Sequence, residues 1–343
     1  MENSGLNARR DSRYISEVAA SAYAYPSDSI DNEEYLRRCR FAIGTSPAQL
    51  AIETRMKTRR WCAPSENTAS LVKTVVERLR ESEPDLVSQI DVVVVASGTT
   101  MTMAHPSVAD NVAFADLAPL VLRQLGKNDA FGIDIKACYC AGFLRGLQVV
   151  DGLLGNPNCR AALLIAAEQG SRFATAESNR SSFCYIVSDA AGAFVLRRGE
   201  ARPRAGILDY CGHTDAAKLD WVGIGADAAS IIMLGSRAAE ATLGMLLNMA
   251  RALLDRNGLS VQDVDWLLPI QTHAGLIEQL RASLEWPTEK LLWFGDVNGF
   301  SGSASIPSCF AEQVEQGRIK KGQLVLSLAV GAGMNCAGAL YYA

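Results

Sequence analysis

Two kinds of hydrophobic pattern alternate along the chain. Short apolar runs, rich in β-branched residues and typical of strands buried on both faces of a sheet, alternate with longer segments whose apolar residues recur at helical spacing. In the first half, strands are predicted at 90–96, 130–135, 161–168 and 190–197. Helices are predicted at 68–86, 109–127 and 142–154. This alternation predicts an α/β protein built on parallel-rich sheets.

The second half of the chain repeats this order. Helices are predicted at 238–256, 274–284 and 307–317, strands at 265–270, 323–329 and 337–342, and a further apolar segment lies at 291–294. A repeated unit predicts two pseudo-twofold-related halves in layers, with helices outside and between the sheets. We expect a flexible tail at 1–12, an N-terminal half at 13–200 and a C-terminal half at 201–343. No linker rich in proline or glycine separates the halves, so we expect one shared core.

Composition narrows the class of protein. The chain has 343 residues, of which 49% are hydrophobic and 20% charged, as in an ordinary globular protein. A net charge of −4 and the lack of a long basic run argue against a nucleic-acid partner. No apolar run approaches the roughly 18–20 residues of a membrane span, and the polar N-terminus has no signal core. We therefore expect a cytoplasmic protein without a membrane partner.

Cysteine and histidine usage limits the possible chemistry. Nine cysteines in a cytosolic chain are expected to be reduced thiols rather than a disulfide framework. Cys138 and Cys140 are separated by one residue and have no second Cys/His pair nearby, so no metal site is predicted. The chain has only three histidines, and a histidine base must be one of them. They are His105, His213 and His273.

Cys140 occupies the most informative position in the chain. It lies between the predicted strand 130–135 and the predicted helix 142–154. At such a turn the unpaired N–H groups and the dipole of the helix favour a thiolate, which can act as a nucleophile and acyl carrier. The alternative is a buried structural cysteine, since free cysteines are among the most buried residues. The local pattern leaves both interpretations open.

Four motifs resemble those of the β-ketoacyl-acyl-carrier-protein synthase III family of the thiolase superfamily. Residues 140–143, Cys-Ala-Gly-Phe, are identical to its nucleophile motif. Residues 188–193 resemble its Gly-Asp-Gly-Ala-Gly-Ala turn, 316–323 its Gly-Arg-Ile-Lys-Pro-Gly-Asp segment, and 331–333 its late glycine turn. The matches keep a consistent order from about residue 14 to the C-terminus. The resemblance implies the thiolase fold, with an αβαβα core, and a homodimer.

The resemblance also implies a reaction. Cys140 would accept an acyl group from acyl-CoA or from the phosphopantetheine of an acyl carrier protein, and no permanently bound cofactor is expected. The backbone N–H of Cys140 and one from the turn with Gly331 and Gly333 would form the oxyanion hole. Both glycines could equally serve turn geometry alone. Cys138 would then be a structural or supporting residue.

The chain departs from the family where the catalytic histidine and asparagine are expected. The family's Pro-His-Gln-Ala-Asn segment corresponds to 269–273, which places Ile270 at the histidine and His273 at the asparagine. Phe300 stands where the second asparagine is expected. Isoleucine and phenylalanine neither transfer protons nor donate hydrogen bonds, so we assign both to the substrate pocket.

Two interpretations of His273 remain open. It either acts near Cys140 as base or hydrogen-bond donor, with support from Asp296 or Asn298, or it is a polar residue at a helix start. His105 and His213 are interpreted as structural or substrate-side residues.

The expected donor site also differs from the family. Members often carry a tryptophan shortly before a Thr-Gly-Ile-Arg segment, where it stacks on the adenine of coenzyme A. The corresponding segment, 49–57, has no tryptophan, and Arg55 replaces the glycine. This weakens the case for a coenzyme A donor and favours a carrier protein, which Arg55, Arg59 and Arg60 could contact. The alternative is that these arginines form a solvated face.

The sequence therefore predicts an acyltransferase with a thioester intermediate on Cys140. The acceptor would be a carbon, oxygen, nitrogen or carrier-bound nucleophile, and Ile270 and Phe300 favour a specialised role in natural-product or polyketide biosynthesis. One alternative is a non-catalytic ketosynthase-like subunit paired with an active relative. Others are an ordinary condensing synthase III, or a hydrolase or binder of acyl chains.

Overall fold

The computed structural model describes most of the chain. The described residues are 14–39, 44–99, 105–106, 113–114, 116–136, 139–175, 181–225, 230–233 and 235–343. The predicted tail, Cys138 and the side chain of His105 lie outside this description.

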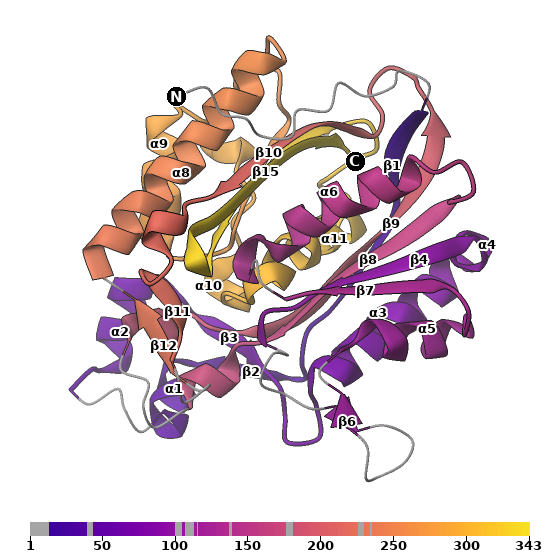
Figure 1. The fold of residues 1–343 in the computed structure, drawn as a ribbon. Helices are drawn as coiled ribbons and strands as arrows, with labels where there is room; N and C mark the ends of the chain where they lie inside the picture. The colour runs from indigo at the N-terminus through magenta and orange to yellow at the C-terminus, as the bar shows by residue number, and fades with distance from the viewer. Residues whose placement is uncertain are drawn as a thin grey trace.

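Two β-sheets form the framework of the molecule (Figure 1). The first has the order β1 (Tyr14–Ala24), β9 (Asp189–Glu200), β8 (Ala161–Gln169), β4 (Ile90–Ala96) and β7 (Phe131–Ile135). The second has the order β10 (Ile207–Thr214), β15 (Asn335–Tyr342), β14 (Leu324–Gly331) and β13 (Trp266–Pro269). Pairing is parallel among β7, β4 and β8 and between β13 and β14.

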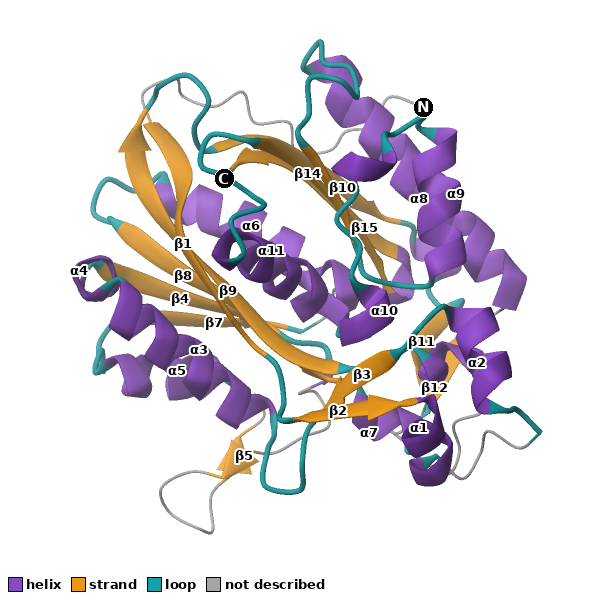
Figure 2. Cartoon of the chain, turned by 180° about the vertical axis from the view of Figure 1, so that it is seen from behind, coloured by secondary structure: helices purple, strands orange, loops and turns teal. Residues whose placement is uncertain are grey.

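Helices complete a five-layer αβαβα stack, visible from both sides (Figures 1 and 2). Helices α3 (Thr68–Ser82) and α5 (Ala118–Leu125) cover the outer face of the first sheet. Helices α6 (Gly142–Leu154) and α11 (Ser305–Glu315) lie between the sheets. Helices α8 (Gly235–Arg256) and α9 (Ala274–Ser283) cover the second sheet. This arrangement confirms the predicted layered thiolase fold.

The strand orders of the two sheets correspond. The first sheet has β1, β9, β8 and β4 in the positions that β10, β15, β14 and β13 have in the second sheet, and corresponding neighbours run in the same relative directions. The counterpart of β7 is reduced to an isolated parallel bridge between Leu267 and Leu291, on the side of β13 away from β14. The apolar segment at 291–294 therefore contributes one bridge and not a strand before α10 (Gly295–Asn298).

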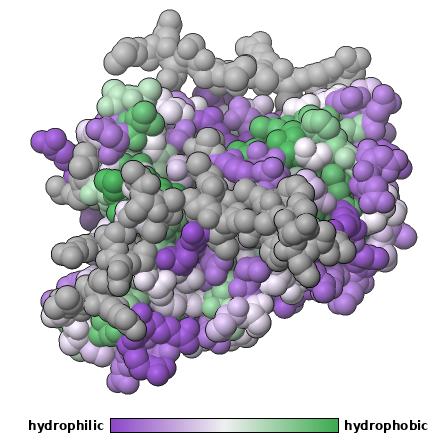
Figure 3. All heavy atoms as spheres, turned by 60° about the horizontal axis from the view of Figure 1, so that its bottom comes forward, coloured by the Kyte–Doolittle hydropathy of each residue, from purple (hydrophilic) through white to green (hydrophobic). Residues whose placement is uncertain are grey.

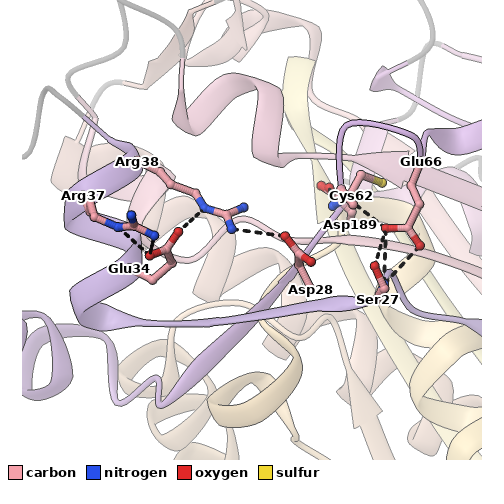
Figure 4. A network of polar contacts seen from close by, with 9 residues as sticks. Ser27, Asp28, Glu34, Arg37, Arg38, Cys62, Glu66 and Asp189 are labelled. Carbon is pink, nitrogen blue, oxygen red and sulfur yellow. Dashed lines mark hydrogen bonds and ion pairs between the residues drawn. The ribbon is translucent and has the colours of Figure 1, made fainter.

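Several short helices and strands lie outside the two sheets and their covering helices. These are β2 (Asp28–Asp31), α1 (Asn32–Arg38), α2 (Pro47–Thr54), β3 (Thr58–Trp61), α7 (Ser171–Ala174), β11 (Val222–Ile224) and β12 (Ile231–Met233). The remaining short elements are α4 (Pro84–Ser88), β5 (His105–Pro106) and β6 (Ala113–Phe114). Ion pairs from Arg38 to Asp28 and Glu34 tie β2 to α1 (Figure 4). None of these elements was predicted from the hydrophobic pattern.

Two predicted helices differ from the structure. The helix expected at 68–86 ends at Ser82, because Pro84 lacks an N–H and starts the separate α4. The helix expected at 109–127 is represented by α5 alone, which ends at Gly126 in the left-handed region (φ 72°). Residues 113–114 form β6 instead, and 107–112 and 115 lie outside the described residues.

One hydrophobic core joins the two halves. Phe194 of β9 packs against Phe310 of α11 (ring centroids 4.6 Å apart) and against Phe143 of α6 (4.9 Å). Tyr341 of β15 completes the cluster, 5.9 Å from Phe194. Helix α11 approaches β9 so closely that a Cβ at Gly192 would lie 2.4 Å from the Ser308 nitrogen. The rings therefore connect both sheets through the middle layer, as the absence of a linker suggested.

The described surface carries several exposed apolar side chains, including Ile52 of α2, Leu219 and Ile232 of β12. On the face seen in Figure 3, hydrophobic areas are separated by hydrophilic ones. None of the described helices combines the length and the apolar character that crossing a membrane requires.

Candidate active site

A strained turn presents Cys140 at the start of α6. Cys140 lies in the 3₁₀ turn Tyr139–Ala141, between β7 and α6. Tyr139 has φ 41°, a left-handed conformation that is uncommon outside glycine. The turn after β4 packs against it, and a Cβ at Gly98 would lie only 2.8 Å from Tyr139 Cδ1. A glycine at position 98 thus allows the two turns to meet beside the cysteine.

Cys140 faces a cavity of about 170 Å³ between the two halves. Most of its wall is apolar, with contributions from the β11–β12 hairpin, α8, α9 and the turn after β14. The titratable side chains in the wall are Tyr139, Cys140, Glu168 and His273. None of the described wall residues is a lysine or arginine. The cavity is therefore suited to an uncharged, apolar group next to a thiol.

A larger cavity, of about 510 Å³, lies along β1 at the edge of the first sheet. Its wall contains Glu17, which forms ion pairs with Arg197 and Arg202. No cysteine or histidine is present in this wall among the residues that the structure describes. The smaller cavity is therefore the candidate active site.

Burial keeps the thiol of Cys140 protonated at neutral pH. Burial raises its pKa to about 12, and the nearby carboxylate of Glu168 contributes to the rise. The sequence led us to expect a thiolate stabilised by the start of α6, and the burial outweighs that effect. A base is consequently needed before Cys140 can attack a thioester.

His273 is placed where it can be that base. It is the residue before α9, and its ring lines the same cavity as Cys140. Burial lowers its pKa, so the imidazole is neutral and able to accept a proton at neutral pH. Within the described part of the chain its ring makes no hydrogen bond and has Phe183 as an aromatic neighbour, with 6.4 Å between ring centroids.

Ile270 and Phe300 both lie in the cavity wall, as assigned from the sequence. Each is 3% exposed. The backbone of Phe300 is held on both sides, since its N–H donates to Ile186 (2.7 Å) and its carbonyl accepts from Ser188 (2.8 Å). The cavity wall therefore has apolar side chains, Ile270 and Phe300, at the two positions where the resemblance predicts a histidine and an asparagine.

The structure does not bring Asp296 and Asn298 to the cavity. The amide of Asn298 donates to Glu312 (3.0 Å) and Tyr25 (3.2 Å), and Asp296 pairs with Lys57 (2.9 Å). Gly299 turns the chain at φ 70°, so Asn298 and Phe300 point to different sides of α10. The expected support of His273 by either residue is therefore absent from this arrangement.

The two glycines of the expected oxyanion hole are placed differently. Gly331, at the end of β14, lies in the cavity wall. Gly333 lies in the following turn, outside the wall, with φ 67°. Gly333 thus fits a role in turn geometry, and of the residues expected to form the oxyanion hole, Gly331 and Cys140 line the cavity.

The three arginines expected at a donor site have different environments. Arg59 is fully buried (0% exposed), donates to Asn32 (2.8 Å) and lies 4.4 Å from the centre of the Tyr35 ring. It cannot meet an external carrier, and this expectation was wrong because alternate residues of β3 point inward. Arg60 is half-buried and donates to Asn298 (3.3 Å). Only Arg55 of the three is exposed.

Sequence reasoning missed Glu168, the one acidic residue among the described residues of the cavity wall. We had interpreted it only as the end of a buried strand. The available signal was its place directly after the apolar run 161–167, where a carboxylate needs local partners. His213, by contrast, lies outside the wall on β10, 3.1 Å from Cys336 Sγ. This placement agrees with a structural role for His213.

Comparison with known proteins adds to this geometry. Residues 133–216 match the family model described as 3-oxoacyl-(acyl-carrier-protein) synthase III, and residues 254–343 match the model of its C terminal. The β-ketoacyl-acyl-carrier-protein synthase III of Erythrobacter litoralis is 30% identical over 94% of this chain and 98% of the relative. That of Methylococcus capsulatus is 29% identical over 96% of this chain and 99% of the relative.

Solved structures show the same fold. The 3-oxoacyl-(acyl-carrier-protein) synthase III of Aquifex aeolicus has a TM-score of 0.83 at 22% identity, covering 96% of this chain and 100% of that chain. A priming β-ketosynthase from a polyketide pathway has a TM-score of 0.82 at 21% identity, covering 98% of both chains. OleA of Xanthomonas campestris, with lauric acid and lauroyl-CoA, has a TM-score of 0.81 at 16% identity, covering 96% and 99%.

Proposed function

Because the chain belongs to the β-ketoacyl-acyl-carrier-protein synthase III family of acyl-transferring enzymes, we propose that Cys140 accepts an acyl group and passes it to an acceptor by a route that needs no malonyl decarboxylation. The observation that carries this proposal is the cavity wall, where Cys140 and His273 share an apolar space with Ile270 and Phe300. Such a wall supports thioester chemistry, yet offers no polar group at the two positions where decarboxylation would need one.

In the first half-reaction, neutral His273 takes the proton of the Cys140 thiol. The sulfur attacks the thioester carbonyl, and the N–H groups of Cys140 and Gly331 stabilise the negative charge on the carbonyl oxygen. The carbon–sulfur bond to the donor then breaks, and the departing thiolate takes the proton from His273. The products are acyl-Cys140 and the free thiol of coenzyme A or a carrier.

In the second half-reaction, His273 removes a proton from the acceptor. The acceptor attacks the acyl-Cys140 carbonyl, and Cys140 leaves and regains a proton. Carbon, oxygen, nitrogen and carrier-bound sulfur nucleophiles all satisfy this scheme, and we place the reaction in specialised biosynthesis. The apolar wall, without lysine or arginine, supports an uncharged acyl group.

The donor is an acyl thioester of a carrier protein or of coenzyme A. Arg55 supports this assignment, because it is exposed at the end of α2 and can meet phosphate or acidic groups. Replacement of Arg55 with glutamate is expected to raise KM for the donor and to leave kcat unchanged. An unchanged KM would remove Arg55 from the donor site.

We also propose a homodimer formed through β7. Among the described strands, β7 pairs on one side only, with β4, and Phe131 at its start is 56% exposed. An open edge with an exposed aromatic residue favours pairing with a second copy. Light scattering should show two chains for the wild type and one for Phe131→Asp. A monomeric wild type contradicts this assembly.

Intact-mass measurement tests the central proposal. The protein is incubated with panels of acyl-CoA and acyl-carrier thioesters, and one acyl mass should be added to the wild type. The addition should be lost in Cys140→Ala and kept in Cys62→Ala, a matched control at another half-buried cysteine. His273→Gln should slow the addition without abolishing it. The proposal would be refuted if Cys140→Ala were labelled as strongly as the wild type, or if neither the wild type nor any variant were labelled.

A second candidate function is a non-catalytic subunit that pairs with an active relative. The observation that favours it is again Ile270 and Phe300 in the wall. It predicts that no donor acylates Cys140 while the chain raises the activity of a purified synthase partner. Release of carbon dioxide from malonyl donors would instead identify an ordinary condensing synthase.

A further inference from the structure

Glu168 occupies an unusual position at the end of β8. Its carboxylate is 2% exposed and lies in the same cavity wall as Cys140. One oxygen accepts from the Gly98 N–H (2.9 Å) and the Ser303 hydroxyl (2.5 Å). The other accepts from the Thr99 N–H (2.8 Å) and the Ser97 hydroxyl (3.4 Å).

These contacts define what Glu168 can do. An ionised carboxylate offers about four lone-pair positions, and each of them here has a donor. Burial raises the pKa of the Glu168 carboxyl above its ordinary value, and these four donors oppose that rise by favouring the charged form. They also leave no free lone pair with which Glu168 could take a proton from a substrate. Glu168 is therefore poorly suited to be a general base, in contrast to His273, whose ring makes no hydrogen bond to the described residues.

The donors that Glu168 holds lie on both sides of Cys140. Gly98 packs against Tyr139, the residue before the nucleophile, at a distance that only glycine permits. Ser303 packs against Gly142, the residue two after it, since a Cβ there would lie 3.6 Å from the Ser303 Cβ. The Ser303 hydroxyl oxygen also lies 3.3 Å from the carbonyl oxygen of Ala96, at the end of β4. The Glu168 carboxylate thus forms hydrogen bonds with both segments that pack against the turn containing Cys140.

We propose that Glu168 is a positioning residue for the nucleophile: it holds the turns 97–99 and 302–304 against the two sides of Cys140 and places a carboxylate in the wall beside the thiol. The inference rests on the proposed role of Cys140 as acyl acceptor. It assigns to this family member a buried anion inside the acyl cavity, tied to the structure and not to the substrate.

When Glu168 is ionised, none of the described residues that share the cavity wall with it supplies a positive charge. The groups that share the cavity wall with it are the phenol of Tyr139, the thiol of Cys140 and the imidazole of His273, which burial keeps neutral. The described wall has no lysine or arginine. In agreement, Glu168 raises the pKa of both Cys140 and Tyr139, adding to the effect of burial.

The test separates charge from position. Cys140 is alkylated with iodoacetamide across a pH series and followed by intact mass, and acylation is followed in parallel. Glu168→Gln removes the charge, so the alkylation midpoint should move down by about one unit. It also places an amide N–H against a donor, so kcat for acylation should fall on the order of 100-fold with a smaller change in KM. Glu168→Asp keeps the charge, so its midpoint should stay while kcat falls.

Asp189 provides a matched control. It is another fully buried carboxylate, at the start of β9, and accepts from the Cys62 N–H (2.7 Å, Figure 4) and from Ser171. It does not line the cavity. Asp189→Asn should lower stability without moving the alkylation midpoint. Should Glu168→Gln fail to fold, Ser303→Ala removes one donor to the same carboxylate and should reduce kcat to a lesser degree.

The outcomes are distinct. A wild-type midpoint in Glu168→Gln, wild-type kcat in Ser303→Ala, or an equal midpoint shift in Asp189→Asn would overturn the positioning role. If the wild type is alkylated but accepts no acyl group from any donor, the proposed function fails. The alkylation midpoints then still decide whether Glu168 controls the thiol.

Discussion

Replacing Phe300 with alanine is expected to change which acyl groups Cys140 accepts. The ring is 3% exposed and forms part of the wall of the acyl cavity. Its removal opens space next to the nucleophile that a larger acyl group can fill. Phe300→Ala should therefore favour longer or branched donors over the donors that suit the wild type.

The size of the effect follows from the buried hydrocarbon. Each methylene that enters the new space contributes about 0.8 kcal/mol, so three methylenes contribute about 2.4 kcal/mol, or roughly 50-fold in relative kcat/KM. The same substitution costs about 3–5 kcal/mol of unfolding free energy, as for other buried phenylalanines. Part of this cost is the edge-on contact with Phe183, whose ring centroid lies 5.3 Å away.

The assay is a competition between acyl donors of different length, read by intact mass on Cys140. Phe310→Ala is the control, because Phe310 is equally buried (2% exposed) but lies outside this cavity. It should lose similar stability and keep the wild-type preference. If Phe300→Ala also keeps that preference, or Phe310→Ala changes it equally, the ring does not limit the acyl group.

Three further predictions concern single residues. Asn298→Ala should lower the unfolding free energy by about 1–3 kcal/mol in urea denaturation, because it removes one of the two donors to Glu312 and leaves only the Tyr25 hydroxyl, and it should not alter alkylation of Cys140. Arg55→Gly should raise stability by about 1 kcal/mol, since Arg55 has φ 55°, whereas Arg55→Ala keeps the strain. Because burial lowers the pKa of His273, the acid limb of the acylation rate should lie below about pH 6.5 and should disappear in His273→Gln.

The elements that could be predicted are those whose burial is uniform. Strand β4 and helix α6 have the predicted bounds because β4 is buried along almost its whole length and α6 has a regular apolar face. Strand β1 was not predicted from the sequence, because polar residues interrupt its apolar pattern. Ser16 donates to Asp151 (2.6 Å), and Glu17 pairs with arginines far along the chain. Such partners leave no local pattern in the sequence.

The same distinction applies to the active site. Cys140, Ile270, His273 and Gly331 each belong to a local motif, and the structure gathers them around one cavity. The roles of Arg59 and Asn298 depend on tertiary partners, so they were misassigned. Glu168 was overlooked for the same reason, as its donors lie about 70 and 135 residues away along the chain.

The two halves of the molecule end differently at corresponding edges. The first sheet ends in β7, a full strand with a free side, whereas the second ends at β13, where the Leu267–Leu291 bridge occupies the matching place. A duplicated protein with two open edges could add copies at both and grow into a fibre. At β13 a single residue pair, the Leu267–Leu291 bridge, stands in that position, so only the first sheet keeps the complete edge strand. In the homodimer that we propose, divergence between the repeats therefore leaves β7 as the edge through which two copies would pair.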